Sequence, residues 1–417
     1  MKRTSIITAL FLLNFSVGEA FDLSLADAVN IALNNNTALK ITEQGERSAQ
    51  FALKRAKSNK GFSATASDNL QTSKVKGEAR QDGNNLSVSG SLPILSGGKN
   101  TANVDAAKIG IDIAALNTER ERENLRYNVI KAYFDILEAK KTVAVNQESV
   151  DNYAAHYQNV SDLFTAGAKA KIDVLRSSVE LSNARQTLIK SQNTYDVNTA
   201  TFKNLLNIAG GEQLNLTDDF SFVAFSPQMD ECINYALNNR KDLTVDEYTI
   251  KQKDLAITAA KADWLPGVNL NVGLNNSDTF HPASQNSHGA SAGVGVSWNI
   301  FDSGVTRATV DSAKTDYDVA VLTLKKDKEN IELSVRTAYL NMREAEKRFQ
   351  STSDAVQEAE EDFFIAREKY RAGEGIMLDI IDAQLALSTA KLNYIGAQYD
   401  YARYKAELEN AMGLPVE

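Results

Sequence analysis

One long heptad pattern occurs twice in this chain, at a spacing of 206 residues (Gly373 against Gly167). Apolar or small residues recur every three or four positions over 331–370, and each has a counterpart 206 positions earlier. A sustained heptad is typical of helices packed as coiled coils. Each pattern ends with an aromatic residue and an Ala-Gly pair, and glycine is a common helix stop because it tolerates a left-handed backbone. The sequence therefore predicts two helical hairpins, with tips near 164–173 and 370–379.

A shorter motif extends this duplication toward the N-terminus. Ala-Leu-Asn-Asn occurs at 32–35 and again at 236–239, an offset of 204 residues. The two-residue difference from the hairpins predicts a small insertion between this motif and the second hairpin. The chain therefore divides into repeat 1 at 21–210, a linker or equatorial segment at 211–229, and repeat 2 at 230–417.

Two short segments in each repeat alternate apolar and polar residues. Their polar positions are almost all Asn, Ser and Gly, whereas a half-buried sheet of a soluble protein would normally carry charge there. A tilted strand of about 10 residues is long enough to cross a bilayer. The pattern favours transmembrane strands, with Trp264, Trp298 and Phe301 as an interfacial aromatic girdle. The predicted strands lie at about 62–70, 86–95, 266–276 and 289–301, and a short linker strand is predicted at 220–225.

Four strands are too few to close a barrel, since barrels formed by one chain have eight or more strands. An open sheet edge in lipid would leave backbone groups without hydrogen-bond partners. Several copies must therefore share one barrel. The sequence thus predicts a mainly α fold that carries a transmembrane β-barrel.

The first twenty residues have the pattern of a secretory signal peptide. Lys2 and Arg3 precede an apolar run over 6–13, and small residues follow up to Ala20, after which we expect cleavage. The apolar run is too short to span a bilayer, which takes about 20 residues. No cysteine lies at the predicted cleavage point, so lipid anchoring there is not expected.

Composition excludes several classes of function. The net charge of −9 argues against a nucleic-acid partner, which would need clustered Lys and Arg. The single cysteine, Cys232, and the three histidines, His156, His281 and His288, do not have the spacing of a metal site or of a nucleophile with its base. We therefore expect no enzyme activity, no cofactor and no metal.

The order of these features resembles the TolC-like outer-membrane efflux and secretion channel family, in its non-lipidated branch. The matching segments are Ala-Tyr-Phe-Asp-Ile-Leu at 132–137, Ile-Phe-Asp-Ser-Gly at 300–304, Tyr-x-x-Gly at 370–373 and Asp-x-x-Asp-Ala at 379–383. The resemblance covers essentially the whole chain after the signal peptide, and the duplication makes the set of short motifs specific.

The resemblance implies a homotrimer in the outer membrane. Three chains would share a 12-stranded barrel that continues as an α-helical tunnel through the periplasm. Such a channel is the exit duct of a tripartite efflux or type I secretion system. It docks with a periplasmic adaptor protein and an inner-membrane transporter, and passes small molecules or polypeptides to the exterior.

The resemblance also implies a periplasmic gate near the second hairpin tip. Asp379 and Asp382 match paired aspartates that ring the closed mouth, and threefold symmetry would make that ring favour cations. Tyr370 and Asp173 match residues whose bonds hold the tip closed. The arginine of that latch is replaced here by Gly375.

Arg176 offers a substitute for the missing arginine, because it is the repeat 1 counterpart of Asp382 (382 − 206). We expect Arg176 to pair with Asp382 or Asp379 across neighbouring hairpins. The adaptor contacts are expected at the two tips, at Ala166, Gly167, Ala168, Ala372, Gly373 and Glu374.

Two alternatives stay open at this level. One is a channel of the same fold dedicated to type I secretion of a protein. The other is a periplasmic coiled-coil scaffold without a pore, which would have no use for the alternating strands. A duct does not select its cargo by pocket chemistry, so the sequence does not specify the exported substrate.

Overall fold

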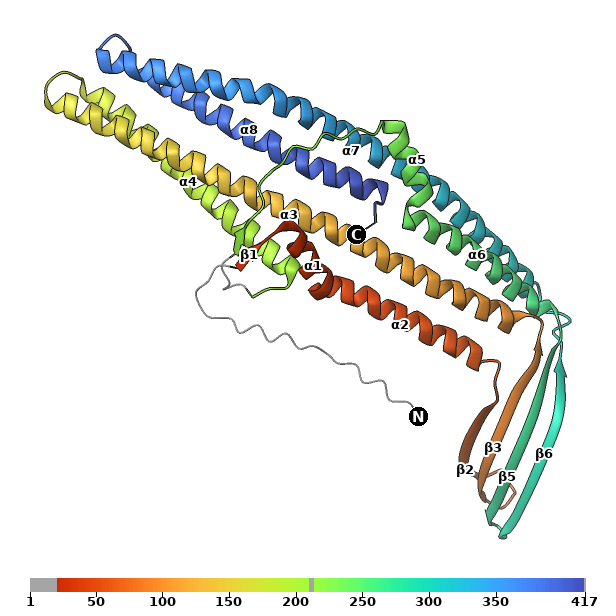
Figure 1. Ribbon diagram of the computed structural model, residues 1–417. Helices are drawn as coiled ribbons and strands as arrows, with labels where there is room; N and C mark the ends of the chain where they lie inside the picture. The colour runs from red at the N-terminus through yellow and green to blue at the C-terminus, as the bar shows by residue number, and fades with distance from the viewer. Residues whose placement is uncertain (1–20, 210–213, 416–417) are drawn as a thin grey trace, which may run out of the picture. The chain divides into compact units, whose positions relative to one another are not determined.

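The structure, a computed structural model, describes residues 21–209 and 214–415. The predicted signal peptide, the last residue of predicted repeat 1 (210) and the first residues of the predicted linker, 211–213, lie outside the described residues. The fold is mostly helical, and the same order of elements occurs twice (Figure 1). The helices are α1 (Leu25–Asn35), α2 (Thr37–Ser58), α3 (Lys99–Thr165) and α4 (Lys171–Leu206), followed by α5 (Met229–Asn239), α6 (Lys241–Lys261), α7 (Val305–Ala372) and α8 (Met377–Met412).

The chain folds into two compact units, and α3 and α7 contribute to both. Unit 1 holds the described parts of 1–36, together with 125–226 and 340–407, and unit 2 holds 37–124, 227–339 and the described part of 408–417. Unit 1 therefore contains both hairpin tips, and unit 2 contains the main sheet.

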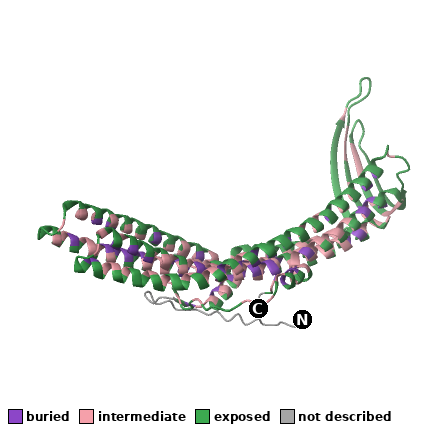
Figure 2. Cartoon of the chain, turned by 90° about the horizontal axis from the view of Figure 1, so that it is seen from above, coloured by how far each residue is buried: buried purple, intermediate pink, exposed green. Residues whose placement is uncertain are grey.

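The predicted heptad stripe forms the core of the long helices. Val129 and Ile136 of α3 and Met342 and Ala345 of α7 are all buried. Figure 2 shows buried residues spaced along the helices and a largely exposed sheet. The last stripe position of the first copy is an exception, because Phe164 lies in the final turn at the hairpin tip and is 41% exposed.

The main sheet has four antiparallel strands in the order β2-β3-β5-β6. Both repeats contribute, and β3 pairs with β5 across them. Within the described chain β2 and β6 each pair on one side only. The strands are β2 (Ser63–Ser73), β3 (Gln81–Ser96), β5 (Gly267–His281) and β6 (Gln285–Ser297).

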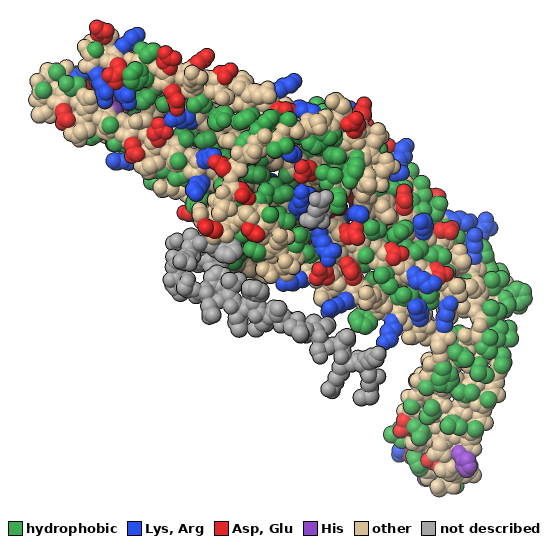
Figure 3. Space-filling view, viewed as in Figure 1, with side chains coloured by type: hydrophobic (Ala, Val, Ile, Leu, Met, Phe, Trp, Pro, Cys, Tyr) green, Lys and Arg blue, Asp and Glu red, His purple; other side chains and the backbone are tan. Residues whose placement is uncertain are grey.

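The strand pairing gives the sheet one apolar face and one polar face. The apolar face consists of Ala64, Ala66, Val88, Leu92, Leu270, Val272, Leu274, Ala290, Ala292 and Val294. The polar face consists of Ser67, Ser87, Ser89, Asn271, Gly273, Asn275, Ser291 and Gly293. Figure 3 shows hydrophobic side chains gathered on the strands, whereas charged side chains are spread over the helices.

Two predicted strand positions are wrong. The fourth strand was expected to reach 301, but β6 ends at Ser297, which pairs with Gly267, the first residue of β5. Pro266 precedes that residue and has no N–H with which to continue the ladder. Trp298 and Phe301 therefore follow the sheet instead of ending it.

The predicted linker strand at 220–225 is not formed either. The strand in this region is β4 (Leu214–Leu216), which pairs in parallel with β1 (Phe21–Leu23). Residues 220–225 instead pack by their side chains, because the Phe222 ring stacks on Phe349 with centroids 5.7 Å apart. The Tyr401 hydroxyl donates a hydrogen bond of 2.7 Å to the Val223 carbonyl, so a side chain takes the place of a neighbouring strand.

Candidate functional site

Both hairpin tips have the same backbone geometry. Gly167 follows α3 with φ of +79°, and Gly373 follows α7 with φ of +80°. Ala168 N–H donates to the Leu163 carbonyl at 2.8 Å, and the equivalent bond from the N–H after Gly373 measures 2.9 Å. This is the Schellman arrangement, which uses glycine because its left-handed conformation costs other residues free energy. The predicted contact residues of both tips, 166–168 and 372–374, are exposed.

The two predicted gate aspartates lie on the exposed side of α8, within its first two turns. Ile380 and Ala383 face the core, and Asp379 and Asp382 are exposed. The Asp379 carboxylate accepts a hydrogen bond of 3.2 Å from the Ile376 backbone N–H. Asp379 therefore also stabilises the helix N-terminus, where a negative charge is favourable.

Tyr370 lies inside unit 1 and is only 5% exposed. Its ring centroid is 5.4 Å from that of His156 on α3, and the Lys169 ammonium lies 4.6 Å from the ring centroid. Within the described chain its hydroxyl has no hydrogen-bond partner. Tyr370, one of the two predicted latch residues, thus makes no latch hydrogen bond through its hydroxyl within the described chain. Tyr370 instead holds the first tip and α3 against the end of α7.

The predicted pairing of Arg176 is not formed within one chain. Arg176 is exposed, and in the described part of the chain its guanidinium has no ion pair with Asp379 or Asp382. All three side chains are therefore available to a second copy.

Unit 1 contains a partly open cavity of about 110 Å³ between α3, α7 and α8. His156, Arg367, Tyr370 and Gln384 line it. Burial, together with the Lys169 ammonium, lowers the pKa of His156 below its ordinary value. Of these residues only Tyr370 was predicted from the sequence to be functional, because His156 on α3 meets the other three only when the helices pack.

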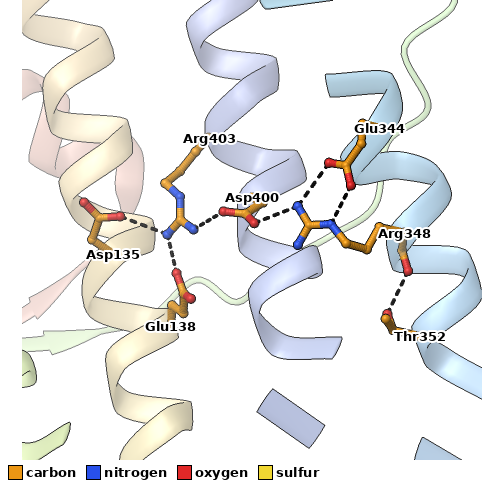
Figure 4. A network of polar contacts seen from close by, with 7 residues as sticks. All are labelled: Asp135, Glu138, Glu344, Arg348, Thr352, Asp400 and Arg403. Carbon is orange, nitrogen blue, oxygen red and sulfur yellow. Dashed lines mark hydrogen bonds and ion pairs between the residues drawn. The ribbon is translucent and has the colours of Figure 1, made fainter. Parts of the chain in front are cut away.

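A second cluster missed from the sequence joins three helices of unit 1 (Figure 4). Arg403 of α8 contacts Asp135 of α3 at 2.9 Å and also pairs with Glu138 and Asp400. Burial raises the pKa of Glu138, and the carboxylates around Arg403 raise the pKa of its guanidinium although burial opposes them.

The cluster continues to α7 through Asp400. Arg348 contacts Asp400 and Glu344, each at 2.9 Å. The network therefore connects α3, α8 and α7 with alternating charges, which keeps its partly buried carboxylates paired.

Two features are absent from the residues that the structure describes, a membrane-spanning helix and a metal-binding cluster. Among the residues that the structure describes, no helix combines the length and apolar character needed to cross a membrane. In the same residues, no group of three or more His, Cys, Asp and Glu side chains could hold a metal ion.

Comparison with known proteins identifies the family. The sequence model described as "Outer membrane efflux protein" matches this chain twice, at residues 28–208 and 232–414. The chain belongs to the outer membrane efflux protein family. The two matches begin 204 residues apart (232 − 28) and end 206 residues apart (414 − 208), the two offsets found in the sequence.

Curated relatives of this efflux protein are distant but similar over most of its length. It is 22% identical to outer membrane efflux protein BepC of Brucella suis, over 94% of this chain and 86% of that one. It is 22% identical to nodulation protein T of Rhizobium leguminosarum, over 77% of this chain and 69% of that one. A third relative is the cobalt-zinc-cadmium resistance protein CzcC of Cupriavidus metallidurans, with 24% identity over 73% and 71%.

Solved structures share the fold of this efflux protein. The Campylobacter jejuni CmeC outer membrane channel matches with a TM-score of 0.81 at 18% identity, covering 93% of this chain and 85% of that one. The outer-membrane channel OprN matches with a TM-score of 0.79 at 18% identity, covering 93% and 89%. The predicted resemblance to TolC-like channels and the predicted location in the outer membrane are therefore confirmed. The family consists of channel and transport proteins and not of enzymes.

Proposed function

We propose that three copies of this efflux protein form the outer-membrane exit duct of a tripartite export system. The observation that carries the proposal is the four-stranded sheet, which has one apolar face and one polar face. Its edge strands, β2 and β6, each have a neighbouring strand on one side only within the described chain.

The two faces of the sheet suit a barrel wall. In transmembrane barrels, apolar side chains face lipid and polar side chains face a water-filled interior, in strict alternation. The polar face here carries small uncharged side chains, and Ser67 and Ser87 hydrogen-bond across it at 2.7 Å. We infer that the apolar face contacts lipid and the polar face lines the pore.

The edges of the sheet supply the argument for a trimer. An unpaired strand edge in lipid leaves backbone N–H and C=O groups without hydrogen-bond partners, at a cost of about 2–7 kcal/mol each. The outer edge of β6 can pair with that of β2 in the next copy, and repetition of this contact closes a ring. Three copies of four strands make 12, within the range of transmembrane barrels. The long helices of the three copies then form a periplasmic tunnel.

In this arrangement, repeats 1 and 2, at 21–210 and 230–417, each supply one strand pair and one hairpin. The described part of the linker, 214–229, is proposed to lie around the helical part. The hairpin tips contact a periplasmic adaptor protein, which connects the duct to an inner-membrane transporter. The cargo class is small molecules or polypeptides, as in efflux or type I secretion. Relatives of this chain include outer membrane proteins of efflux pumps.

Two measurements test the duct itself. Light scattering of the purified protein in detergent is expected to give the mass of three chains, and planar lipid bilayers are expected to show single-channel currents. A trimer without currents would favour the periplasmic scaffold. A monomer would contradict the shared barrel.

The gate is proposed at Asp379 and Asp382, with Asp173, Arg176 and Tyr370 beside it. Three copies would bring six exposed carboxylates to one mouth, which raises the local concentration of cations. We expect the double variant D379N/D382N to lose cation selectivity, measured as a reversal potential in a salt gradient. The double variant D354N/D362N, which removes two exposed charges from α7, serves as the control.

The Arg176 pairing has its own test. If Arg176 binds Asp379 or Asp382 of another copy, Arg176→Ala will increase the single-channel conductance. The matched control is Arg185→Ala, an exposed arginine farther along α4. Equal conductance of the two variants would contradict a latch at Arg176.

Adaptor contact at the tips is tested with substitutions that add a charged, larger side chain and keep both glycines. Replacing Ala166, Ala168 and Ala372 with glutamate should abolish capture of a co-expressed periplasmic adaptor while the trimer persists. Ala355→Glu, at an exposed position of α7, is the control. Adaptor capture by the triple variant at the wild-type level would place the contact elsewhere.

A further inference from the structure

Four buried polar atoms without a protein partner belong to residues that line one cavity in unit 1. They are His156 Nε2, Arg367 Nε, Tyr370 Oη and Gln384 Oε1, none of which makes a hydrogen bond within the described chain. Buried polar groups are nearly always hydrogen-bonded, because leaving one unpaired is costly. Four such atoms around one cavity therefore indicate a site that a polar ligand completes.

The site is held by three helices, and two of its side chains, Gln384 and Tyr370, are fixed by their neighbours. Gln384 is 2% exposed, and its amide nitrogen donates to Ser388 Oγ at 3.0 Å, which leaves its carbonyl oxygen as a free acceptor. The Tyr370 ring contacts both the His156 ring and the Lys169 ammonium. Such preorganised groups lose little conformational freedom when a ligand binds.

The charges around the cavity favour an anion. Two arginines, Arg367 and Arg371, and one histidine line the cavity, and no aspartate or glutamate of the described chain does. This contrasts with the whole chain, which has 54 acidic and 45 basic residues. Glu368 pairs with Arg371 at 3.0 Å, which leaves Arg367 as the arginine available to a ligand. Glu368 also lies 3.5 Å from Arg367 Nε, but without hydrogen-bond geometry, so this N–H stays available.

The size of the cavity limits the ligand. A cavity of about 150 Å³ holds benzene, and this one measures about 110 Å³. An anion of four or five non-hydrogen atoms fits within this space. Arginine favours carboxylates because its planar N–H groups match their geometry.

We propose that this cavity binds a small monocarboxylate, and that a 2-hydroxy acid such as glycolate binds more tightly than acetate. The carboxylate accepts hydrogen bonds from Arg367, Tyr370 and His156. The hydroxyl group of the acid donates to Gln384 Oε1. Because these residues come from α3, α7 and α8, the ligand joins the first hairpin to the second. The inference concerns the interior of one chain and does not depend on the pore.

The test is isothermal titration of the purified full-length protein in detergent with sodium glycolate and with sodium acetate. Sodium chloride keeps the ionic strength constant and serves as the anion without a carboxylate. We expect saturable binding of both ligands, tighter for glycolate, and an increase in melting temperature that follows occupancy. Absence of saturable binding by either ligand would overturn the proposal and leave water as the only occupant.

Two variants assign the roles of individual residues. Arg367→Gln should weaken binding of both ligands by at least about tenfold, because it removes a charge-assisted hydrogen bond. Gln384→Met should abolish the preference for glycolate while acetate still binds. Arg336→Gln, at an exposed arginine of α7 outside the cavity, should leave both affinities unchanged. Wild-type affinity in the Arg367 variant would place the anion elsewhere and overturn the proposal, and the wild-type titration stands even if a variant fails to fold.

Discussion

Arg403 offers the sharpest test of what holds the hairpins of unit 1 together. Its guanidinium is 16% exposed and pairs with three carboxylates, those of Asp135, Glu138 and Asp400 (Figure 4). Replacing it with methionine keeps most of the stem and its packing but leaves those three carboxylates without their shared cation. Asp400 alone keeps a partner, because Arg348 also contacts it.

The expected cost follows from the burial of the cluster. Removing one member of a buried ion pair destabilises a protein by about 3–5 kcal/mol. The carboxylates here are 24–32% exposed, which places the expected loss at the low end, about 3 kcal/mol. Unfolding entropy of about 2.1 cal/mol/K per residue gives roughly 0.9 kcal/mol/K for 417 residues. Arg403→Met should therefore lower the melting temperature by about 3–4 °C.

The assay is thermal unfolding in detergent, followed by circular dichroism at a fixed scan rate. The control is Arg336→Met, which removes an exposed ion pair within α7 and should cost at most about 1 kcal/mol. The loss caused by Arg403→Met should be smaller at pH 5 than at pH 8. Burial already raises the pKa of Glu138, so without Arg403 this residue takes up a proton as the pH falls. Equal melting shifts in the two variants would refute the reasoning.

Three other substitutions test separate parts of the structure in the same melting assay. Burial and the neighbouring Asp327 raise the pKa of Asp246 to about 6 from 3.8, so the folded state binds more protons between those values and stability falls as the pH rises through them. Asp246→Asn should therefore stabilise the protein by about 1 kcal/mol above pH 6, after allowance for solvent screening, and not below pH 4. Tyr133→Phe removes a hydroxyl that lies 3.1 Å from both the Leu23 carbonyl and the Asp218 backbone N–H. The loss of these two hydrogen bonds should cost about 1–2 kcal/mol. Gly97→Ala should cost about 1–3 kcal/mol, because φ is +60° and the new Cβ would lie 2.7 Å from the Ala262 carbonyl oxygen. An unchanged melting temperature for the Tyr133 or the Gly97 variant would contradict the contacts described.

Periodic features could be predicted from the sequence because regular backbone geometry repeats every few residues. The heptad from 331 to 370 specifies which face of α7 is buried, and Val335, Ala338 and Met342 lie on that face. The alternation around Val272 likewise specified a two-faced strand. The tip glycines could be identified for a related reason, since a left-handed residue after a helix is a local requirement.

Tertiary structure alone decided the features that join distant segments. The pairing of β3 with β5 joins the two repeats in one sheet. The pairing of β6 with β5 fixes where β6 ends, because Ser297 lies opposite Gly267, the first residue of β5. The short strand β4 exists because β1, nearly 200 residues away, supplies its partner.

The polar sites were likewise decided by tertiary structure alone. Arg403, Asp135 and Glu138 meet because α3 and α8 pack side by side, and each looks like an ordinary solvated charge in the sequence. His156 and Gln384 are likewise unremarkable until packing buries them around one cavity. Burial and proximity set the cost of an unpaired charge or hydrogen-bonding group, and both are properties of the folded chain and not of any segment within it.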